Sequence, residues 1–317
     1  MSNIGRGSKL PQNIIVIAGP TASGKSALAL DLAKTYNGVV VNADASQVYE
    51  HIPTISAAPS VEDRKIAEHQ LYCYLDEAVN GNVCMWLDLA VDCVHKIWQE
   101  GKTPIFVGGS GMYIDNLING VTPIPETPSE IRKQVANEMQ KQGLSSIYQK
   151  LCKIDDKTSI MLKANDKTRI CRAYEIWLST GKTISFWYQQ PMLRKLPEAT
   201  FFSISLLPEK KILDERCRIR FSKMIENGAI DEVKYLLSRN LSPSLPAMSA
   251  KGVPEIISAL KGEISITQAA ELAVLHTRQY AKRQLTWFRN KLKADVIFKE
   301  CYEGQKTLIN CVKKQYK

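Results

Sequence analysis

The octapeptide Gly19-Pro20-Thr21-Ala22-Ser23-Gly24-Lys25-Ser26 matches the pattern G-x-x-x-x-G-K-[ST], which is typical of loops that bind phosphate chains. Residues 14–18, an apolar and β-branched run, come directly before it and predict a buried strand. After it, leucines and alanines recur at the spacing of one helix face. This order directs backbone N–H groups and a helix N-terminus at an anion. We therefore predict that all eight residues bind a diphosphate, with Lys25 neutralising its oxygens and the Ser26 hydroxyl binding Mg²⁺.

Two further strand ends are predicted to carry polar or glycine-rich sequence. The apolar run 39–41 leads into Asn42-Ala43-Asp44, and the run 104–107 ends in Gly108-Gly109-Ser110. In open α/β sheets, ligands lie beyond the carboxyl ends of the strands. We therefore expect Asp44 beside the phosphate-binding loop, where a base or a metal-orienting carboxylate would act. The alternative is that Asp44 caps the next helix or bonds its own turn.

The charge of the chain favours a polyanionic partner. The 317 residues include 42 Lys and Arg against 32 Asp and Glu, a formal net charge of +10. From Thr277 to Lys317 there are eleven basic and three acidic residues, so the charge is concentrated. Such a concentration favours a partner such as a nucleic acid.

The cysteines and the apolar runs of the chain indicate in which cellular compartment the protein is expected. The eight cysteines include no C-x-x-C pair, so a structural zinc site is not expected and the thiols are expected to be reduced. No apolar run approaches the roughly 20 residues of a membrane span, and residues 1–13 lack the apolar stretch of a secretory signal. We expect a cytoplasmic protein with no membrane partner.

The first part of the chain predicts an α/β fold. Strands and helices alternate from residue 14 to about residue 117. One of these helices carries an apolar stripe that includes Trp86, Val94 and Ile97, and Gly101 ends it. The alternation predicts a P-loop NTPase-like parallel sheet flanked by helices.

The middle of the chain predicts an all-helical insertion. Prolines punctuate residues 122–128, and Thr127-Pro128-Ser129-Glu130 has the pattern of a capping box at a helix start. Gly143 is expected to end this helix, and further helical stretches follow near 155–162 and 167–180. We assign residues 119–197 to the insertion, and residues 13–118 and 198–317 to the α/β core with its C-terminal helices.

Residues 201–206 predict a strand that returns the chain to the sheet, and three helical segments follow. The first directs one apolar stripe inward and holds Arg216 and Arg220 on another face. The last, about 266–292, is expected to hold Val274, Ala281, Leu285 and Phe288 inward and Arg278, Lys282 and Arg289 outward.

These motifs together resemble the tRNA dimethylallyltransferase (IPP transferase) family. The resemblance rests on residues 19–26, 44–49, 108–113 and 278–287, and it extends from about residue 14 to 291. It implies transfer of a dimethylallyl group from dimethylallyl diphosphate to the exocyclic amine of the adenosine 3′ to the anticodon. It also implies that the anticodon stem-loop of tRNA is the partner, that the insertion helps to bind it, and that Mg²⁺ is the cofactor. We expect the protein to act as a monomer.

The resemblance implies roles for individual residues. Asp44 matches a general base, Thr21 matches a residue that holds the prenyl diphosphate, and Arg220 matches an arginine that contacts it; these three are the expected catalytic residues. The positions expected to contact tRNA are Asp44, Ala45, Ser46, Gln47, Ser110, Arg132, Thr168, Arg169, Ile170, Cys171, Arg172, Arg278 and Lys282.

Three positions depart from the family pattern. Ala45 stands where the family usually has Ser, Ser110 where it has Thr, and Ala58 where it has Lys or Arg. Ser110 keeps the hydroxyl. Ala45 and Ala58 remove a hydrogen-bonding group and a cation, which affects affinity rather than chemistry.

Two other classes fit part of the sequence. A small-molecule P-loop kinase would explain the phosphate-binding loop and Asp44, but not the basic C-terminal half. An RNA-binding P-loop NTPase would explain the charge and would hydrolyse ATP or GTP. From the residues alone, these alternatives remain open.

Overall fold

The computed structural model describes residues 12–316, so most of the polar segment 1–13 lies outside the described residues. The described chain forms two compact units, of which the first comprises residues 12–118 and 196–316 and the second residues 119–195. The first unit is built on one parallel sheet with the strand order β3-β2-β4-β1-β5-β6. Its strands are β1 (Asn13–Ala18), β2 (Gly38–Asn42), β3 (His69–Gln70), β4 (Thr103–Gly108), β5 (Thr200–Leu206) and β6 (Val296–Phe298). The predicted parallel α/β sheet is confirmed.

This unit contains ten α-helices within the described residues. They are α1 (Lys25–Tyr36), α2 (Pro53–Ser56), α3 (Val61–Ile66), α4 (Val83–Gln99), α5 (Gly111–Asn119), α10 (Lys210–Glu226), α11 (Ala229–Ser238), α12 (Val253–Leu260), α13 (Ile266–Lys291) and α14 (Lys306–Gln315), with a 3₁₀ turn η1 (Ala247–Ser249).

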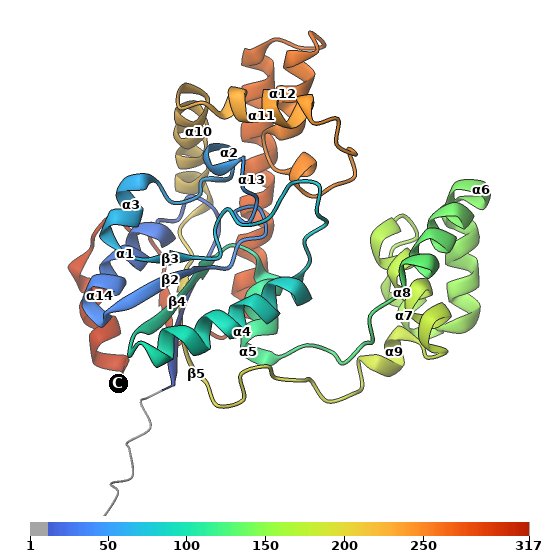
Figure 1. Ribbon diagram of the computed structural model, residues 1–317, viewed down its shortest axis with the longest axis horizontal. Coiled ribbons are helices and arrows are strands. Elements are labelled where there is room, and N and C mark those ends of the chain that lie inside the picture. The colour runs from blue at the N-terminus through green and yellow to red at the C-terminus, as the bar shows by residue number, and fades with distance from the viewer. Residues whose placement is uncertain (1–11, 317) are drawn as a thin grey trace, which may run out of the picture. The chain divides into compact units, whose positions relative to one another are not determined.

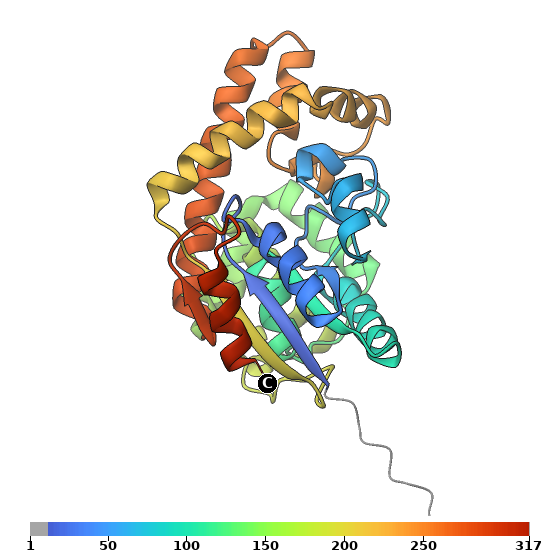
Figure 2. The ribbon, with the colours of Figure 1, turned by 90° about the vertical axis from the view of Figure 1, so that its left-hand side faces the viewer.

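Two helical layers cover the sheet, because successive strand residues point to opposite faces. Ile15 and Ile17 of β1 pack with α1 and α14 on one face, which Figure 2 turns toward the viewer. On the other face, the ring of Trp86 from α4 packs edge-on against Phe106 of β4 and stacks on Tyr113 of α5. The predicted Trp86 stripe is therefore core.

Helices α10, α11 and α12 extend beyond the carboxyl edge of the sheet (Figure 1). Helix α13 packs against both α10 and α12. The expected inward stripe of α10 is confirmed, since Leu213, Cys217, Phe221 and Met224 are buried. Along α13, Ala281, Leu285 and Phe288 are buried as expected, whereas Val274 is only half-buried and its neighbour Ala273 is buried instead.

The second unit contains α6 (Ser129–Ile154), α7 (Asp156–Met161), α8 (Lys167–Thr180) and α9 (Ile184–Trp187). Its core packs α6 against α8. Gly143 does interrupt α6, with a φ of +79°, but the chain resumes a helix and continues to Ile154. The prediction that the helix ends at Gly143 was therefore only half right.

The predicted capping box at the start of α6 is wrong. The helix begins at Ser129 after Pro128, without a side-chain cap. The Thr127 side chain is buried and accepts a hydrogen bond from Arg172 of α8 instead. A tertiary contact has thus replaced the local one that the pattern suggested.

None of the helices within residues 12–316 is both long enough and apolar enough to cross a membrane.

Candidate functional site

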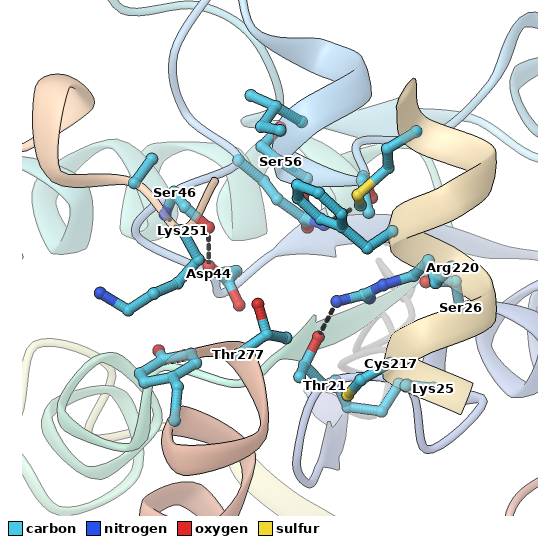
Figure 3. Close-up of a pocket in the computed structure, with 18 of the residues that line it drawn as sticks. Thr21, Lys25, Ser26, Asp44, Ser46, Ser56, Cys217, Arg220, Lys251 and Thr277 are labelled. Carbon is cyan, nitrogen blue, oxygen red and sulfur yellow. Dashed lines mark hydrogen bonds between the residues drawn. The ribbon is translucent and has the colours of Figure 1, made fainter. Parts of the chain in front are cut away.

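A cavity of about 720 Å³ opens at the carboxyl edge of the sheet in the first unit. Its walls come from the loops after β1 and β2, from α10, from residues 246–251 and from α13 (Figure 3). The cationic side chains that line it are Lys25, Arg216, Arg220, Lys223 and Lys251, and among the described lining residues Asp44 alone is acidic. Such a cavity stabilises a ligand with several negative charges.

The loop after β1 has a backbone shape that requires glycine. Gly19 has a φ of +152° and Gly24 a φ of +91°. A Cβ at Gly24 would lie only 2.2 Å from the carbonyl oxygen of Tyr302. Gly24 directly precedes α1, which has neither a side-chain cap nor an acidic residue in its first turn. Because the first N–H groups of a helix have no partner within it, this uncapped end can bind an anion.

Lys25 lies at the start of α1 and turns back over the loop. Its Nζ donates a hydrogen bond of 2.7 Å to the carbonyl oxygen of Pro20. Burial lowers the pKa of Lys25 to about 8, although the nearby Asp44 carboxylate partly opposes that shift. A diphosphate would supply the negative charge that this buried ammonium requires.

Helix α10 holds the middle of the loop through two arginines. Arg220 donates to Thr21 Oγ1 (Figure 3), and Arg216, one turn earlier, donates from Nε to the carbonyl oxygen of Ala22 at 2.8 Å. Burial lowers the pKa of Arg220, but an arginine remains charged in proteins. Arg216 was not among the predicted site residues. Its spacing from Arg220 on one helix face was the signal.

Asp44 follows β2 and points into the cavity (Figure 3). Its Oδ1 accepts hydrogen bonds from the Ser46 backbone N–H at 3.0 Å and from the Ser46 hydroxyl at 2.7 Å. Its Oδ2 is approached by the Gly109 N–H at 3.3 Å. Asp44 thus bonds its own turn, as one interpretation expected, and it also lies in the same cavity as the phosphate-binding loop, as the other expected of its location.

Other predicted site residues, after β2 and β4, make hydrogen bonds that join the loops around the cavity. The Ser110 hydroxyl accepts a hydrogen bond of 2.9 Å from the Ala45 N–H, so it joins the loops after β4 and β2. Gln47 Nε2 donates to the carbonyl oxygens of Ser56 and Ala57 at 3.0 and 2.6 Å. Ala45 and Ser46 line the cavity, so a side chain at position 45 can reach a ligand.

The tRNA positions predicted in the insertion belong to the second unit. Thr168 and Arg169 are exposed in the first turn of α8, and Cys171 is half-buried. Arg132 of α6 is half-exposed and lies 3.6 Å from Glu126. Arg169 is exposed like Arg132, whereas Arg172 is half-buried. One assignment needs correction, because Ile170 is fully buried in the core of this unit and its side chain is not available to a ligand.

Helix α13 contributes both lining and outer residues. Thr277 and Tyr280 line the cavity, and Thr277 lies near Asp44 and Thr21 in Figure 3. Lys282 is exposed, whereas the Arg278 guanidinium bonds Asp214 of α10 at 2.8 Å. Arg278 therefore lies at the outer face as expected, but it is half-buried and ion-paired.

The lining residues fit a magnesium ion only if the ligand brings it. Ser26 lines the cavity in the first turn of α1. Within residues 12–316, no group of three or more His, Cys, Asp or Glu side chains could hold a metal. Magnesium keeps several waters and is commonly bound through substrate phosphates with one or two protein oxygens. The Ser26 hydroxyl suits such an ion and does not by itself make a resident metal site.

The parallel sheet, the glycine loop and the cationic cavity define a P-loop-like α/β protein whose cavity is suited to a phosphate chain. Residues 47–291 match the family model described as IPP transferase, and the chain belongs to that family. A curated relative from Rhodopseudomonas palustris, named tRNA dimethylallyltransferase, is 40% identical over 278 residues, covering 88% of this chain and 87% of the relative. One of the same name from Gluconobacter oxydans is 41% identical over 278 residues, covering 87% and 83%.

Solved structures agree with this assignment. The tRNA isopentenylpyrophosphate transferase of Bacillus halodurans is 28% identical with a TM-score of 0.67, over 96% of this chain and 95% of that one. A eukaryotic dimethylallyltransferase acting on tRNA is 26% identical with a TM-score of 0.82, over 96% of this chain and 77% of that one.

Proposed function

We propose that this protein transfers a dimethylallyl group from dimethylallyl diphosphate to the exocyclic amine of the adenosine 3′ to the anticodon of tRNA, releasing diphosphate. One observation supports this proposal above others. The uncapped, cationic phosphate-binding loop and Asp44 line one cavity, at the ends of separate strands. Family membership gives these two groups a common reaction.

The phosphate-binding loop would act on the leaving group. As the allylic C–O bond breaks, its electron pair stays with the diphosphate, and negative charge develops there. Lys25, Arg220 and the N–H groups at the start of α1 are arranged to stabilise that charge. Fixed donors and cations directed at developing charge are often the largest contribution to catalysis.

Asp44 would act on the nucleophile. The adenine amine is a very weak base, and its proton becomes acidic only as the new C–N bond forms. Oδ2 is the better candidate acceptor for that proton, because Oδ1 already accepts two hydrogen bonds from Ser46. The proton lost from nitrogen would then reside on Asp44, while diphosphate leaves with the electron pair of the broken C–O bond. Positioned proton acceptors typically contribute about 10²–10⁴-fold in rate.

The adenosine would have to leave the stacked anticodon loop to enter the cavity. Extruding a base costs a few kcal/mol, roughly, which phosphate contacts can offset. Exposed cations on α8 and α13, such as Arg169 and Lys282, would provide such contacts.

Magnesium would bind with the diphosphate, held on the protein side by the Ser26 hydroxyl. When bound, it would neutralise part of the negative charge of the leaving group. We also propose that the protein works as a monomer, and that it works in the cytoplasm, where its eight free cysteines would stay reduced.

Label transfer tests this function directly. Bulk tRNA is incubated with the protein and, in separate reactions, with radiolabelled dimethylallyl diphosphate, ATP or GTP. We expect label on tRNA only from the allylic diphosphate. Phosphorylation of a small molecule would favour a kinase, and hydrolysis of ATP or GTP without transfer would favour an RNA-binding NTPase.

A further inference from the structure

Gln284 of α13 is a buried amide that makes bonds to two loops distant in the sequence. It is 5% exposed. Its Oε1 accepts a hydrogen bond of 2.9 Å from the Thr21 N–H, in the phosphate-binding loop after β1. Its Nε2 donates a hydrogen bond of 2.8 Å to the carbonyl oxygen of Gly109, in the loop after β4. The amide oxygen thus bonds the loop after β1, and the amide nitrogen bonds the loop after β4.

Both partners of Gln284 contact residues assigned to the reaction. Thr21 accepts a hydrogen bond from Arg220 through its hydroxyl. Gly109 directs its own N–H at Asp44 Oδ2, at 3.3 Å. One side chain therefore joins the group that holds the diphosphate to the group that orients the carboxylate.

The backbone at Gly109 is closely packed against both Gln284 and Asp44. A Cβ at position 109 would lie 2.2 Å from Gln284 Nε2 and 3.2 Å from Asp44 Oδ2. Glycine at this position lets the amide and the carboxylate approach the same backbone segment from two sides. The neighbouring Gly111 has a similar role, since a Cβ there would lie 2.5 Å from the ring of Trp287 on α13.

The order of the strands explains why such a tie is needed. Asp44 follows β2 and Thr21 follows β1, and β4 lies between these two strands. No direct pairing between β1 and β2 therefore fixes the separation between Thr21 and Asp44. Effective transfer requires the reacting atoms to be held close and aligned, and small displacements cost much of the rate.

We propose that Gln284 is a positioning residue that fixes the separation between the diphosphate-binding loop and the Asp44 carboxylate. This inference rests on the proposed function and adds to it a requirement for one buried amide. Gln284 is not among the residues that line the cavity. It acts through Thr21 on one side and through Gly109 on the other.

The test is a double-mutant cycle of Gln284→Met and Gly109→Ala, with steady-state kinetics of prenyl transfer to tRNA. Methionine keeps the size of glutamine but leaves the Thr21 N–H and the Gly109 carbonyl oxygen unpaired. We expect kcat to fall about tenfold or more, with a raised KM for the allylic diphosphate. The Kd for tRNA should stay within about twofold, because the amide is buried.

Gly109→Ala retains Gln284 but displaces its amide, because the new Cβ would lie 2.2 Å from Nε2, so it keeps the test valid if Gln284→Met does not fold. It should lower kcat with a smaller change in the KM for the diphosphate. Since both substitutions act through one contact, the double variant should lose about as much as the worse single variant, not the product of the two. The control is Gln99→Met, the same chemical change at an exposed position of α4.

The outcomes separate this inference from the proposed function. Wild-type protein that transfers no prenyl group to tRNA overturns both. If the wild type is active, a Gln284→Met variant with wild-type kcat overturns the positioning role. So do losses that multiply in the double variant, or a tenfold weaker tRNA affinity at unchanged kcat.

Discussion

Lys25 gives the diphosphate site a pH dependence. Burial lowers its pKa to about 8, so the side chain of the unliganded protein loses its charge as the pH rises above 8. A bound diphosphate favours the charged form. Affinity for dimethylallyl diphosphate should therefore be full below pH 8 and fall above it, by up to about tenfold per pH unit.

Direct titration of the diphosphate between pH 7 and pH 9.5, without tRNA, measures this effect. Lys25→Met should bind more weakly and show no inflection near pH 8. An affinity of the wild type that stays constant across this range would mean that Lys25 does not contact the diphosphate.

At the same scale, Arg220 and Arg218 form a matched pair on α10. Arg220 donates to Thr21 in the phosphate-binding loop, whereas Arg218 is exposed and pairs with Glu215. Arg220→Met should raise the KM for the allylic diphosphate and lower kcat, each about tenfold, because it removes a charged group from the leaving-group site. Arg218→Met should change both by less than about twofold. Equal kcat and KM values for the two variants would mean that Arg220 does not contact the diphosphate.

Among the elements, α13 is predicted to bind tRNA phosphates with its exposed side. Lys282 is exposed, while Arg278 is held by Asp214. Lys282→Ala should therefore flatten the log–log salt dependence of tRNA binding by about 0.7–0.9, and Arg278→Ala by less. Binding titrations across a range of salt concentrations measure these slopes. Lys34→Ala, at an exposed position of α1, is the control. Identical slopes for Lys282→Ala and wild type would mean that the tRNA lies elsewhere.

Elements with a strong local pattern were predictable. The apolar runs before Gly19, Asp44 and Gly108 gave strands close to the observed bounds of β1, β2 and β4. Strands β3 and β6 are two and three residues long, and such short segments have no periodicity to detect. The Gln284 bonds were also beyond prediction, because Thr21 and Gln284 are 263 positions apart and only the fold brings them together.

Some residues of the candidate site could be predicted from the sequence, and others could not. Asp44 and the phosphate-binding loop were found because each follows a strand in a recognisable pattern. The protein partners of a cation depend on the tertiary structure, so the bonds of Arg172 to Thr127 and of Arg278 to Asp214 could not be predicted from the sequence. Ile170 was assigned by a motif whose helix turns that side chain into the core.

For the whole molecule, the insertion should be separable from the α/β core. Residues 119–195 have their own core, and the chain enters and leaves this unit side by side, since Val121 and Leu193 exchange backbone hydrogen bonds of 3.0 and 2.8 Å. A variant with residues 122–192 replaced by a short glycine-serine linker should fold. It should bind the allylic diphosphate like the wild type and bind tRNA at least about tenfold more weakly.

Calorimetric titration with each ligand checks this prediction, and circular dichroism checks the fold. Loss of diphosphate binding in a folded variant would mean that the insertion supports the cavity. Unchanged tRNA affinity would mean that α13 and the core bind the tRNA without it.

The proposed reaction requires Asp44 and the phosphate-binding loop to lie in one cavity, as they do. The single-turnover rate of label transfer from dimethylallyl diphosphate to saturating tRNA isolates the chemical step, and Asp44→Asn changes the base with almost no change in shape. We expect this variant to be at least about 100-fold slower, with both substrates bound within about twofold of wild type and Asp92→Asn on α4 unaffected. Transfer by Asp44→Asn at close to the wild-type rate would contradict the assignment of Asp44 as the base.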